Sequence, residues 1–414
     1  MNLHIKLVKS INYIEGETME LNGKQKQGLQ IAIQRFKNKE KYTVISGYAG
    51  AGKSTLVRFI IEELKTLGIK DIDVCFACFT GKAAQVLLKK GNRNVLTLHK
   101  LLYKSIPKAS GGFMLVPRQS VPYKIVVVDE VSMAPKTLMD LLFSHDVHVI
   151  CLGDPFQLPP IDKKEDNHLL DTPHIFLDEI MRQAQESEII QLSMAIRTGQ
   201  EISNFQGKEV QILNKEELNT GMLEWADQIL VATNATRTTI NNQMRQMLNF
   251  GNEPQEGDKV ICLRNYWDCL SETEEPLVNG TIGILHDVFY TKRYLPRYVQ
   301  SVDGKGYIDI LMGNFISDSG MYFSNMEMDK KMIETGEGSL DWKTIFQLNK
   351  NPRTRDIPPL EFTYGYAITC HKAQGSEWDK VLVIEEKFPY QKEEHARWLY
   401  TAITRASEKL VLVR

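Results

Sequence analysis

The stretch GYAGAGKST, residues 47 to 55, constrains this chain more than any other part of its sequence. It follows an apolar run, YTVIS, that reads as a buried strand, and it leads into residues 53 to 67, whose apolar positions recur at helical spacing. Glycines in that context let backbone N–H groups and the positive end of the helix converge on a phosphate. The pattern arises by chance in about 1 to 2% of chains of this length. It predicts a nucleotide-binding loop in an α/β sheet rather than a merely structural turn.

The residue types within this stretch indicate which contacts with ATP and Mg2+ each would make. Lys53 is expected to reach the β- and γ-phosphates, and the hydroxyl of Ser54 is expected to reach the metal ion. The residues expected to bind the nucleotide through this loop are Gly50, Ala51, Gly52, Lys53, Ser54 and Thr55. ATP and Mg2+ are therefore the predicted cofactors.

A pair of carboxylates, Asp129 and Glu130, closes the apolar run IVVV. At the end of a neighbouring strand, Asp129 would hold Mg2+ through water, and Glu130 would polarise the attacking water as general base. Alone, such a pair is as readily the start of a helix. Together with Lys53 it predicts a metal ligand and a catalytic base.

The next apolar run, VHVICL, ends in GDPFQLPP, residues 153 to 160. The side chain of Gln157, at that strand end, is a candidate to sense the γ-phosphate. Glycine, aspartate and proline are also ordinary turn residues, so a plain polar turn is the alternative.

Strand-like and helix-like runs alternate along most of the chain, which is typical of parallel sheets with crossover helices. One series ends near residue 172, and a second begins near residue 175. Two segments break the alternation: residues 104 to 123 hold a Ser-Gly-Gly turn between strand-like runs, and residues 281 to 362 hold strand-like bursts between turn residues. The sequence therefore predicts two α/β units, each with a β-rich insertion.

The composition narrows the class of protein. The 414 residues, of which 43% are apolar and 25% charged, indicate a globular chain of more than one domain. Fifty basic against 52 acidic residues give a net charge of −2, so the chain lacks an overall basic surface and any nucleic-acid site must be local. The sequence has no apolar stretch of membrane-spanning length and no export signal at its start, so we expect a cytosolic protein.

Six cysteines are scattered along the chain, and a disulfide framework is not expected from their spacing. Cys75 and Cys78 form a CxxC pair within an apolar, strand-like run that has no second pair nearby. A redox or zinc site is the alternative, but free cysteine is among the most frequently buried residues. We predict that both side chains belong to the core.

Eight short motifs follow one another along the chain. They are GYAGAGKST (47 to 55), FTGKAA (79 to 84), TLHKLL (97 to 102), VVVDEVSM (126 to 133), GDPFQLPP (153 to 160), MRQA (181 to 184), TCHKAQGSEWDKV (369 to 381) and LYTAITRA (399 to 406). In this order and spacing they resemble the motifs of the superfamily 1 helicases, and most closely those of the 5'-to-3' branch that contains RecD and the phage Dda helicases. The resemblance covers residues 21 to 414, nearly the whole chain.

The resemblance implies an α/β fold with two RecA-like P-loop NTPase cores and ATP in the cleft between them. A small β-hairpin would be inserted in the first core and an SH3-like β-rich segment in the second. The implied divisions are core 1A at residues 1–103 and 124–172, hairpin 1B at 104–123, core 2A at 173–280 and 363–414, and insertion 2B at 281–362.

Roles for further residues near the nucleotide also come from the resemblance. Gln25 looks like the adenine-reading glutamine, and Glu377 resembles the ribose-contacting glutamate. Arg182 and Arg405 resemble the two arginines that approach the γ-phosphate from the second core, where a permanent positive charge would stabilise the transition state. The alternatives are an exposed helix-start residue for Gln25 and surface ion pairs for the arginines. The implied catalytic set is Lys53, Glu130, Gln157, Arg182 and Arg405.

Four residues, Thr80, His99, Thr369 and His371, resemble positions that line a channel for single-stranded nucleic acid. Hydroxyls and backbone amides at strand ends and helix starts can hold phosphates without a strongly basic surface. Each histidine could instead be a hydrogen-bonded structural residue. Many relatives have proline where this chain has Phe79, which leaves the local path of that strand end open.

Phe113 stands beside the predicted turn Gly111-Gly112 of the hairpin. It is a candidate to stack on a base at a DNA fork, because stacking of a base on an aromatic side chain contributes about 1 to 3 kcal/mol. Packing of Phe113 on its own hairpin is the alternative.

The activity implied by the resemblance is that of an ATP-dependent DNA helicase, moving 5' to 3' on single-stranded DNA and separating strands in replication or repair. The expected setting is the cytoplasm of a bacterial or phage-infected cell. Expected partners are single-stranded and fork DNA and single-strand-binding or replication proteins, with the protein itself a monomer. The alternatives are a translocase that displaces bound proteins without strand separation, an RNA helicase, and a nucleotide switch or kinase-like enzyme, which would not need the motifs at 369–381 and 399–406.

Overall fold

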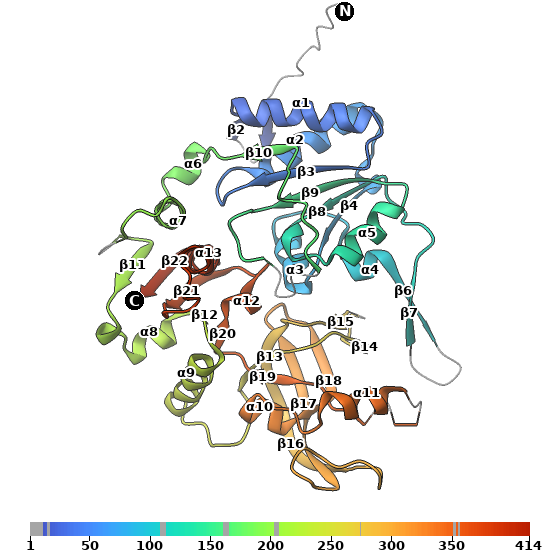
Figure 1. Ribbon diagram of the computed structural model, residues 1–414, viewed down its shortest axis with the longest axis vertical. Helices are drawn as coiled ribbons and strands as arrows, with labels where there is room; N and C mark the ends of the chain where they lie inside the picture. Colours follow the sequence, from blue (N-terminus) through green and yellow to red (C-terminus); the bar gives the residue numbers. More distant parts are fainter. Residues whose placement is uncertain are drawn as a thin grey trace, which may run out of the picture.

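The computed structural model describes residues 11–14, 17–107, 113–159, 165–202, 207–273, 275–350, 353–354 and 357–414. Figure 1 shows two parallel sheets with helices packed against them and an antiparallel sheet below them. Within these ranges, no helix is both long enough and apolar enough to cross a membrane.

The first parallel sheet has six strands in the order β10-β3-β9-β8-β4-β5. Their bounds are β3 (Tyr42–Gly47), β4 (Val74–Cys78), β5 (Val95–Thr97), β8 (Ile125–Val128), β9 (His148–Gly153) and β10 (Ile175–Leu177). The helices of this unit are α1 (Gly23–Lys37), α2 (Lys53–Thr66), α3 (Gly81–Lys89), α4 (Leu98–Leu102) and α5 (Lys136–Ser144). A two-stranded hairpin, β1 (Ile11–Ile14) and β2 (Glu17–Glu20), precedes them.

Both faces of this sheet are buried, which explains the continuous apolar run of β8. Ile125 and Val127 pack in one apolar cluster, and Val126 and Val128 pack in another. Successive residues of a strand point to opposite faces, so a strand covered on both sides needs apolar residues throughout. The side chains of Cys75 and Cys78 in β4 are buried, which confirms that they belong to the core.

Strand β10 lies in the first sheet although it follows the predicted end of the first core at residue 172. Its three residues pair in parallel with residues 45–47 of β3. A strand this short needs an open sheet edge, and β3 offers one on the side away from β9. The sequence predicts that these residues belong to the second core, because the second series of alternations begins near residue 175.

The second parallel sheet has five strands in the order β11-β22-β21-β12-β20. Their bounds are β11 (Val210–Leu213), β12 (Gln228–Val231), β20 (Ala367–Thr369), β21 (Trp378–Ile384) and β22 (Ala406–Val413). The helices of this unit are α6 (Arg182–Gln185), α7 (Glu188–Thr198), α8 (Thr220–Trp225), α9 (Asn234–Met247), α12 (Cys370–Ala373) and α13 (Lys392–Ile403). The expectation of two α/β units is thus confirmed.

An antiparallel sheet is built mainly from the segment between α9 and β20, in the order β18-β17-β16-β13-β19. Its strands are β13 (Lys259–Cys262), β16 (Ile282–Tyr294), β17 (Tyr307–Ser317), β18 (Tyr322–Asp329) and β19 (Phe362–Tyr364), with α10 (Lys330–Thr335) and α11 (Trp342–Lys350) following β18. The sheet extends beyond the predicted insertion at both ends, since β13 precedes residue 281 and β19 runs past residue 362. Strand β13 joins because it pairs with both β16 and β19.

Two small hairpins complete the fold. Strands β6 (Tyr103–Pro107) and β7 (Phe113–Pro117) form an antiparallel pair that projects from the first core in Figure 1. The predicted turn at Gly111-Gly112 lies outside the described residues, and so does the side chain of Phe113. Strands β14 (Tyr266–Leu270) and β15 (Pro276–Leu277) form the other pair, near the antiparallel sheet.

Candidate functional site

The glycine-rich loop lies between β3 and α2, where the sequence predicted it. Gly52 immediately precedes α2 with φ 79° and ψ 31°, a left-handed conformation that glycine adopts without strain. A Cβ at this position would collide with the side chains of Gln25 and Met181. No side chain caps the first turn of α2, so its N–H groups are left for a bound anion.

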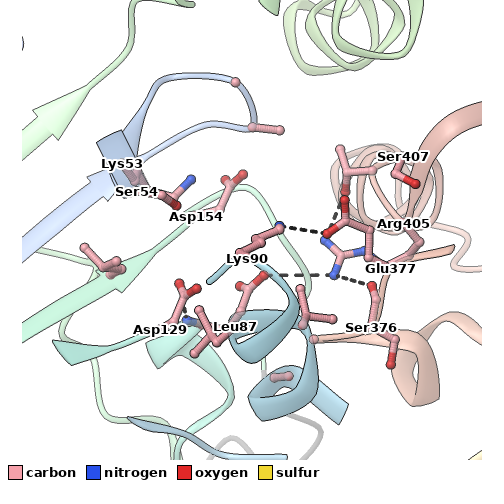
Figure 2. A pocket seen from close by; sticks show the side chains of 18 of the residues that line it. Lys53, Ser54, Leu87, Lys90, Asp129, Asp154, Ser376, Glu377, Arg405 and Ser407 are labelled. Carbon is pink, nitrogen blue, oxygen red and sulfur yellow. Dashed lines mark hydrogen bonds and ion pairs between the residues drawn. The ribbon is translucent and has the colours of Figure 1, made fainter. Parts of the chain in front are cut away.

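Lys53 is folded back onto the loop. Its ammonium group donates to the carbonyl oxygens of Gly47 at 2.7 Å and Tyr48 at 3.1 Å. These contacts hold the positive charge at the mouth of the loop, close to the carboxylates of Asp129 and Asp154 (Figure 2). Phosphate oxygens could take the place of the two carbonyl groups as partners of the ammonium group.

The two predicted carboxylates follow β8 at the floor of the same site. Asp129 accepts a hydrogen bond from the backbone N–H of Glu130 at 2.9 Å. Burial, with a smaller effect of the neighbouring Glu130 charge, raises the pKa of Asp129 to about 6. Asp129 and the hydroxyl of Ser54 offer the oxygen donors that Mg2+ prefers, and both line the same pocket.

Residues of both cores line one cavity of about 400 Å³. The first core contributes Lys53, Asp129 and Glu130, and the second contributes Glu377 and Arg405 (Figure 2). This volume falls in the range of small-ligand sites, and the cavity lies between two parallel sheets at the phosphate loop. The arrangement therefore fits a nucleotide held between the cores.

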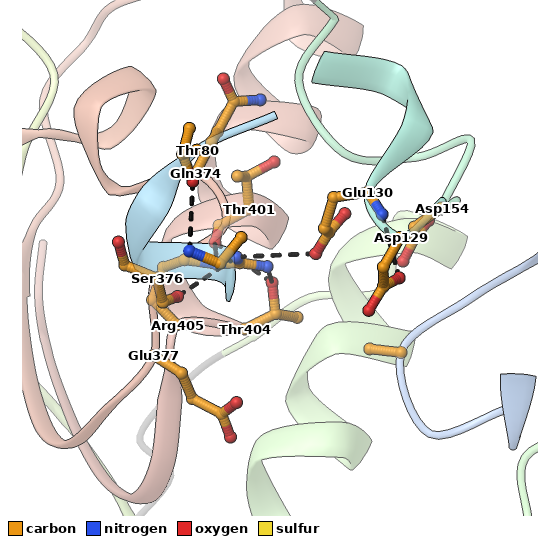
Figure 3. A network of polar contacts seen from close by, with 12 residues as sticks. Thr80, Asp129, Glu130, Asp154, Gln374, Ser376, Glu377, Thr401, Thr404 and Arg405 are labelled. Atoms are coloured by element: carbon orange, nitrogen blue, oxygen red, sulfur yellow. Dashed lines mark hydrogen bonds and ion pairs between the residues drawn. The ribbon is translucent and has the colours of Figure 1, made fainter. Parts of the chain in front are cut away.

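Arg405 crosses from the second core toward the carboxylate of Glu130. Its side chain is 5% exposed, and its guanidinium donates to the carbonyl oxygens of Thr401 at 3.1 Å and Ser376 at 3.3 Å. A guanidinium nitrogen lies 3.9 Å from the Glu130 carboxylate (Figure 3). A buried arginine held in this way presents its charge inside the cavity, not on the surface.

Gln157 joins this pair. With its amide oriented to satisfy both neighbours, Gln157 donates to Glu130 at 3.3 Å and accepts from Arg405 at 3.2 Å. Three residues predicted from separate motifs thus meet at one point. The plain-turn alternative for Gln157 does not account for these contacts.

Gln25 is buried at the back of the loop rather than exposed at a helix start. Its side chain is 1% exposed and forms a reciprocal cap with Asn22 at the start of α1. Its amide nitrogen also lies 3.4 Å from the carbonyl oxygens of Ala51 and Gly52. Gln25 is therefore fixed beside the loop, where an adenine contact remains a prediction.

The other residues expected near the nucleotide differ in how far the structure describes them. Glu377 lines the cavity and pairs with Lys90 at 2.8 Å, a lysine that sequence reasoning missed. Arg182 opens α6, but its side chain lies outside the described residues. The preceding Met181 donates its N–H to the carbonyl oxygen of Gly50 at 3.0 Å, so α6 starts at the phosphate loop.

Thr80, a predicted channel residue of the first core, lies beside Gly375 of the second core. This threonine caps α3 by accepting from the N–H of Ala83 at 3.2 Å. A Cβ on Gly375, in the motif that also contains Thr369 and His371, would lie 3.2 Å from the Thr80 hydroxyl. Thr369 immediately precedes α12, and His371 lies within it. The motifs at 79–84 and 369–381 therefore share one junction between the cores.

His99 and His371 are both half-buried, and burial lowers the pKa of each. The ring of His99 lies 5.9 Å from that of Phe79 and 6.1 Å from that of Tyr103. Neutral histidines in such surroundings fit a packing role as well as a contact with nucleic acid.

Two ion pairs that sequence reasoning missed join the first core to the β-rich region beside these residues. Lys82 lies 3.5 Å from Asp318, and Lys100 lies 2.8 Å from Glu275. Each lysine is in a motif quoted above, but its carboxylate partner is more than 170 residues away along the chain. Spacing alone therefore gave no signal for either pair.

Comparison with known proteins finds two family models that match parts of the chain. A family model described as an AAA domain matches residues 20–217, and one described as a UvrD-like helicase C-terminal domain matches residues 364–413. The first range contains Lys53 and Glu130, and the second contains Arg405. In both parts the chain is thus similar to superfamily 1 helicases of the RecD and Dda branch.

Two curated relatives of this chain illustrate the similarity. The ATP-dependent RecD2 DNA helicase of Deinococcus radiodurans is 25% identical over 400 residues, which cover 89% of this chain and 46% of the relative. The ATP-dependent DNA helicase dda of Enterobacteria phage T4 is 31% identical over 153 residues, 35% of this chain and 34% of the relative. The chain thus spans about half the length of RecD2.

A solved structure supports the fold assignment. In a structure of two coordinating Pif1 helicases at forked double-stranded DNA, one chain matches with a TM-score of 0.50 and 18% identity. The match covers 95% of this chain and 92% of that chain. The two parallel sheets accordingly share the fold of two RecA-like cores.

Proposed function

We propose that the protein is an ATP-dependent DNA helicase that moves 5' to 3' along single-stranded DNA and separates duplex strands. The observation that carries this proposal is the cavity in which Lys53, Asp129 and Glu130 of one core face Arg405 of the other. A nucleotide bound there would be contacted by both cores, so its hydrolysis could change how the cores sit against each other. The relatives RecD2 and dda are named as DNA helicases, which supports DNA as the substrate.

The chain's own groups account for the hydrolysis step. Lys53 and the uncapped N–H groups of α2 would bind the phosphates, and Ser54 and Asp129 would hold Mg2+. When bound, Mg2+ would neutralise charge on the β- and γ-phosphate oxygens. Glu130 would accept a proton from the attacking water, and Arg405 would stabilise the charge of the transition state.

The junction between the cores connects this site to the predicted channel. Gly375 packs against Thr80, and two residues along the chain Glu377 lines the nucleotide cavity. A change in cleft geometry would therefore move Thr369 and His371 relative to Thr80. Repeated closing and opening of the cleft would then advance a single strand held across the two cores.

The experiment that tests the proposal offers the purified protein duplexes with a 5' or a 3' single-stranded tail, in DNA and in RNA, with and without ATP. We expect strand separation that requires ATP and a 5' DNA tail, and none with the matched variant Lys53→Ala. A preference for 3' tails would contradict the proposed direction of movement. Unwinding of RNA duplexes would contradict the proposal that DNA is the substrate. Stimulated ATP hydrolysis without strand separation would instead favour a translocase that displaces bound proteins.

The hairpin β6–β7 is the proposed separating wedge, with Phe113 as the residue that would stack at the fork. It follows α4, which carries His99, so it stands next to the predicted channel. Replacing residues 108 to 118 by a short Gly-Ser turn should preserve DNA-stimulated hydrolysis and sharply reduce strand separation, and Phe113→Ala should show a weaker version. If the shortened protein unwinds DNA at the wild-type rate, the hairpin is not the wedge and another surface separates the strands.

A further inference from the structure

The phosphate loop contacts the second core at two successive residues. The guanidinium of Arg197 in α7 lies 3.8 Å from the centre of the Tyr48 ring. The backbone N–H of Ala49 donates to the hydroxyl of Tyr400 in α13 at 2.8 Å. Of the two contacts, the second is a directional hydrogen bond, so it restricts both the distance and the orientation of the loop against α13.

The Tyr400 hydroxyl also bonds to the motif GDPFQLPP, residues 153 to 160, at the end of β9 in the first core. It donates to one carboxylate oxygen of Asp154 at 2.6 Å, and the other oxygen accepts from the N–H of Phe156 at 2.9 Å. Tyr400 and Asp154 are each 1% exposed. Loss of the hydroxyl would leave the half-buried N–H of Ala49 and a buried carboxylate oxygen of Asp154 without this partner, so both contacts depend on one oxygen atom.

Other hydrogen bonds clamp the same motif to the second core. Arg397 donates to the carbonyl oxygen of Pro155 at 2.9 Å, and the N–H of Leu158 donates to the Thr401 hydroxyl at 2.9 Å. Among the described contacts of α13, however, the bond to Ala49 is the one that reaches the phosphate loop. Tyr400 therefore joins two elements of the first core to one helix of the second.

Arg405 follows the same helix by two residues and is anchored to it. Its Nε donates to the carbonyl oxygen of Thr401 at 3.1 Å, one residue beyond Tyr400. Because a helix moves as a rigid element, the distance between Tyr400 and the loop also sets the distance between Arg405 and the phosphates bound there. We propose that Tyr400 is a positioning residue that ties the phosphate loop to the second core and so places Arg405 for ATP hydrolysis. This inference rests on the proposed ATPase function.

The first test is Tyr400→Phe, which keeps the ring against Phe156, 5.1 Å away, and removes the hydroxyl. We expect kcat for DNA-stimulated ATP hydrolysis to fall about 10- to 100-fold, because misplacing a catalytic group by about 1 Å has that effect. The KM for ATP should stay close to that of the wild type, since the loop's own N–H groups and Lys53 remain.

The matched control is Tyr364→Phe. Tyr364 lies in β19, is also buried, and its hydroxyl has no hydrogen-bond partner among the described residues. Removing that hydroxyl should leave kcat, KM and the unfolding temperature at their wild-type values.

The second test repeats the substitution in an Arg405→Ala background, by single-turnover hydrolysis. If Tyr400 acts through Arg405, removal of the hydroxyl should change the rate of the Arg405→Ala protein less than twofold, because the two effects are then not additive. Should Tyr400→Phe fail to fold, Asp154→Ala removes the acceptor instead, and its loss of kcat should shrink in the same background.

Three results would overturn the inference: wild-type kcat in Tyr400→Phe, a raised KM with unchanged kcat, or an undiminished fall in rate in the Arg405→Ala background. None of them is confused with failure of the proposed function. If the wild type hydrolyses no ATP, the proposed function is wrong, and if Arg405→Ala hydrolyses it normally, the role of Arg405 is wrong. If those two results are as proposed and Tyr400→Phe is normal, only the role of Tyr400 is wrong.

Discussion

Each core has a loop that joins a buried parallel strand to a helix. The two loops differ in whether their backbone N–H groups already have an acceptor within the protein. In the first core, Gly52 precedes α2 and no side chain caps the helix. In the second, Thr233 caps α9, and the carboxylate of Glu386 accepts from the N–H groups of Ala232 at 2.7 Å and Thr233 at 3.0 Å. One loop is left open for an external phosphate, and the other is filled by the protein's own carboxylate.

This difference explains why we expect one nucleotide, and not two, to bind to a chain with two similar cores. Glu386 also accepts from the hydroxyls of Thr233 at 2.8 Å and Thr236 at 2.6 Å, so the second loop already has a fixed anion. The second core would then contribute to hydrolysis through side chains at the cleft, and among the described residues Arg405 lies 3.9 Å from the Glu130 carboxylate.

Removing the contribution of the second core should have the largest effect. Arg405→Ala should lower kcat for ATP hydrolysis by about 10³-fold or more, the effect typical of an arginine at the transferred phosphoryl group. ATP affinity should change little, because the phosphate loop belongs to the first core. Arg414→Ala, which removes a peripheral pair with Glu385 at 3.1 Å, is the control and should hydrolyse ATP normally. Lost affinity with normal turnover would assign Arg405 to binding.

The second-largest effect is expected from removing Lys53, the cation of the open loop in the first core. Lys53→Ala should lower hydrolysis about 10²- to 10³-fold, since the charge that stabilises the phosphates is lost. The fold should persist because glycine backbone shapes the loop, and the unfolding temperature checks this. The exposed Lys37→Ala serves as control, and turnover near wild type in Lys53→Ala would contradict the assignment of the loop.

Removing the carboxylate of the filled loop should affect stability rather than catalysis. Glu386→Ala leaves two N–H groups and two hydroxyls without their acceptor, which should lower the free energy of unfolding by about 1 to 3 kcal/mol. Urea unfolding measures this, with the exposed Glu216→Ala as control. Equilibrium binding should still give one ATP per chain, because the second loop has no lysine at its start. Binding of two nucleotides per chain would show that the Glu386 carboxylate is what keeps ATP out of the second loop.

The pH dependence of stability should show the smallest effect. Burial raises the pKa of Glu386, but the hydrogen bonds from Thr236, Thr233 and Ala232 together outweigh it and hold the pKa below its usual value. The stabilisation is therefore complete above the pKa of the unfolded chain and is lost as pH falls through the lower, folded-state pKa. Wild type and Glu386→Gln should differ most near neutral pH and should converge as the pH falls through the lowered pKa of Glu386 in the folded protein. A constant difference would show that the charge plays no part.

Much of the nucleotide site follows from local sequence. The loop at Lys53 and the carboxylates Asp129 and Glu130 each stand at the end of an apolar strand, a context that the chain itself reveals. Gln157 was a candidate because it follows the end of a strand, whereas Arg405 came from the resemblance of whole motifs, and the structure brings both to Glu130. Their roles in hydrolysis stay predictions until the variants are measured.

Other features had no local signal. Asp154 and Tyr400 lie within quoted motifs, yet nothing in their spacing indicates that one accepts a hydrogen bond from the other at 2.6 Å. Lys90 and Glu377 pair across 287 positions of the chain. Strand β10 reads as the start of the second core and pairs with the first.

The sequence by itself determined the alternation of strands and helices, the phosphate loop and the residue types that can bind and hydrolyse a nucleotide. These depend on periodicity, on glycine at one turn and on charge, all of which are properties of neighbouring residues. Only the tertiary structure decided which strand joins which sheet, which loop is filled by Glu386, and that Tyr400 contacts Ala49. Those outcomes depend on open sheet edges and on side chains that meet after hundreds of residues of chain have folded, and no local pattern carries that information.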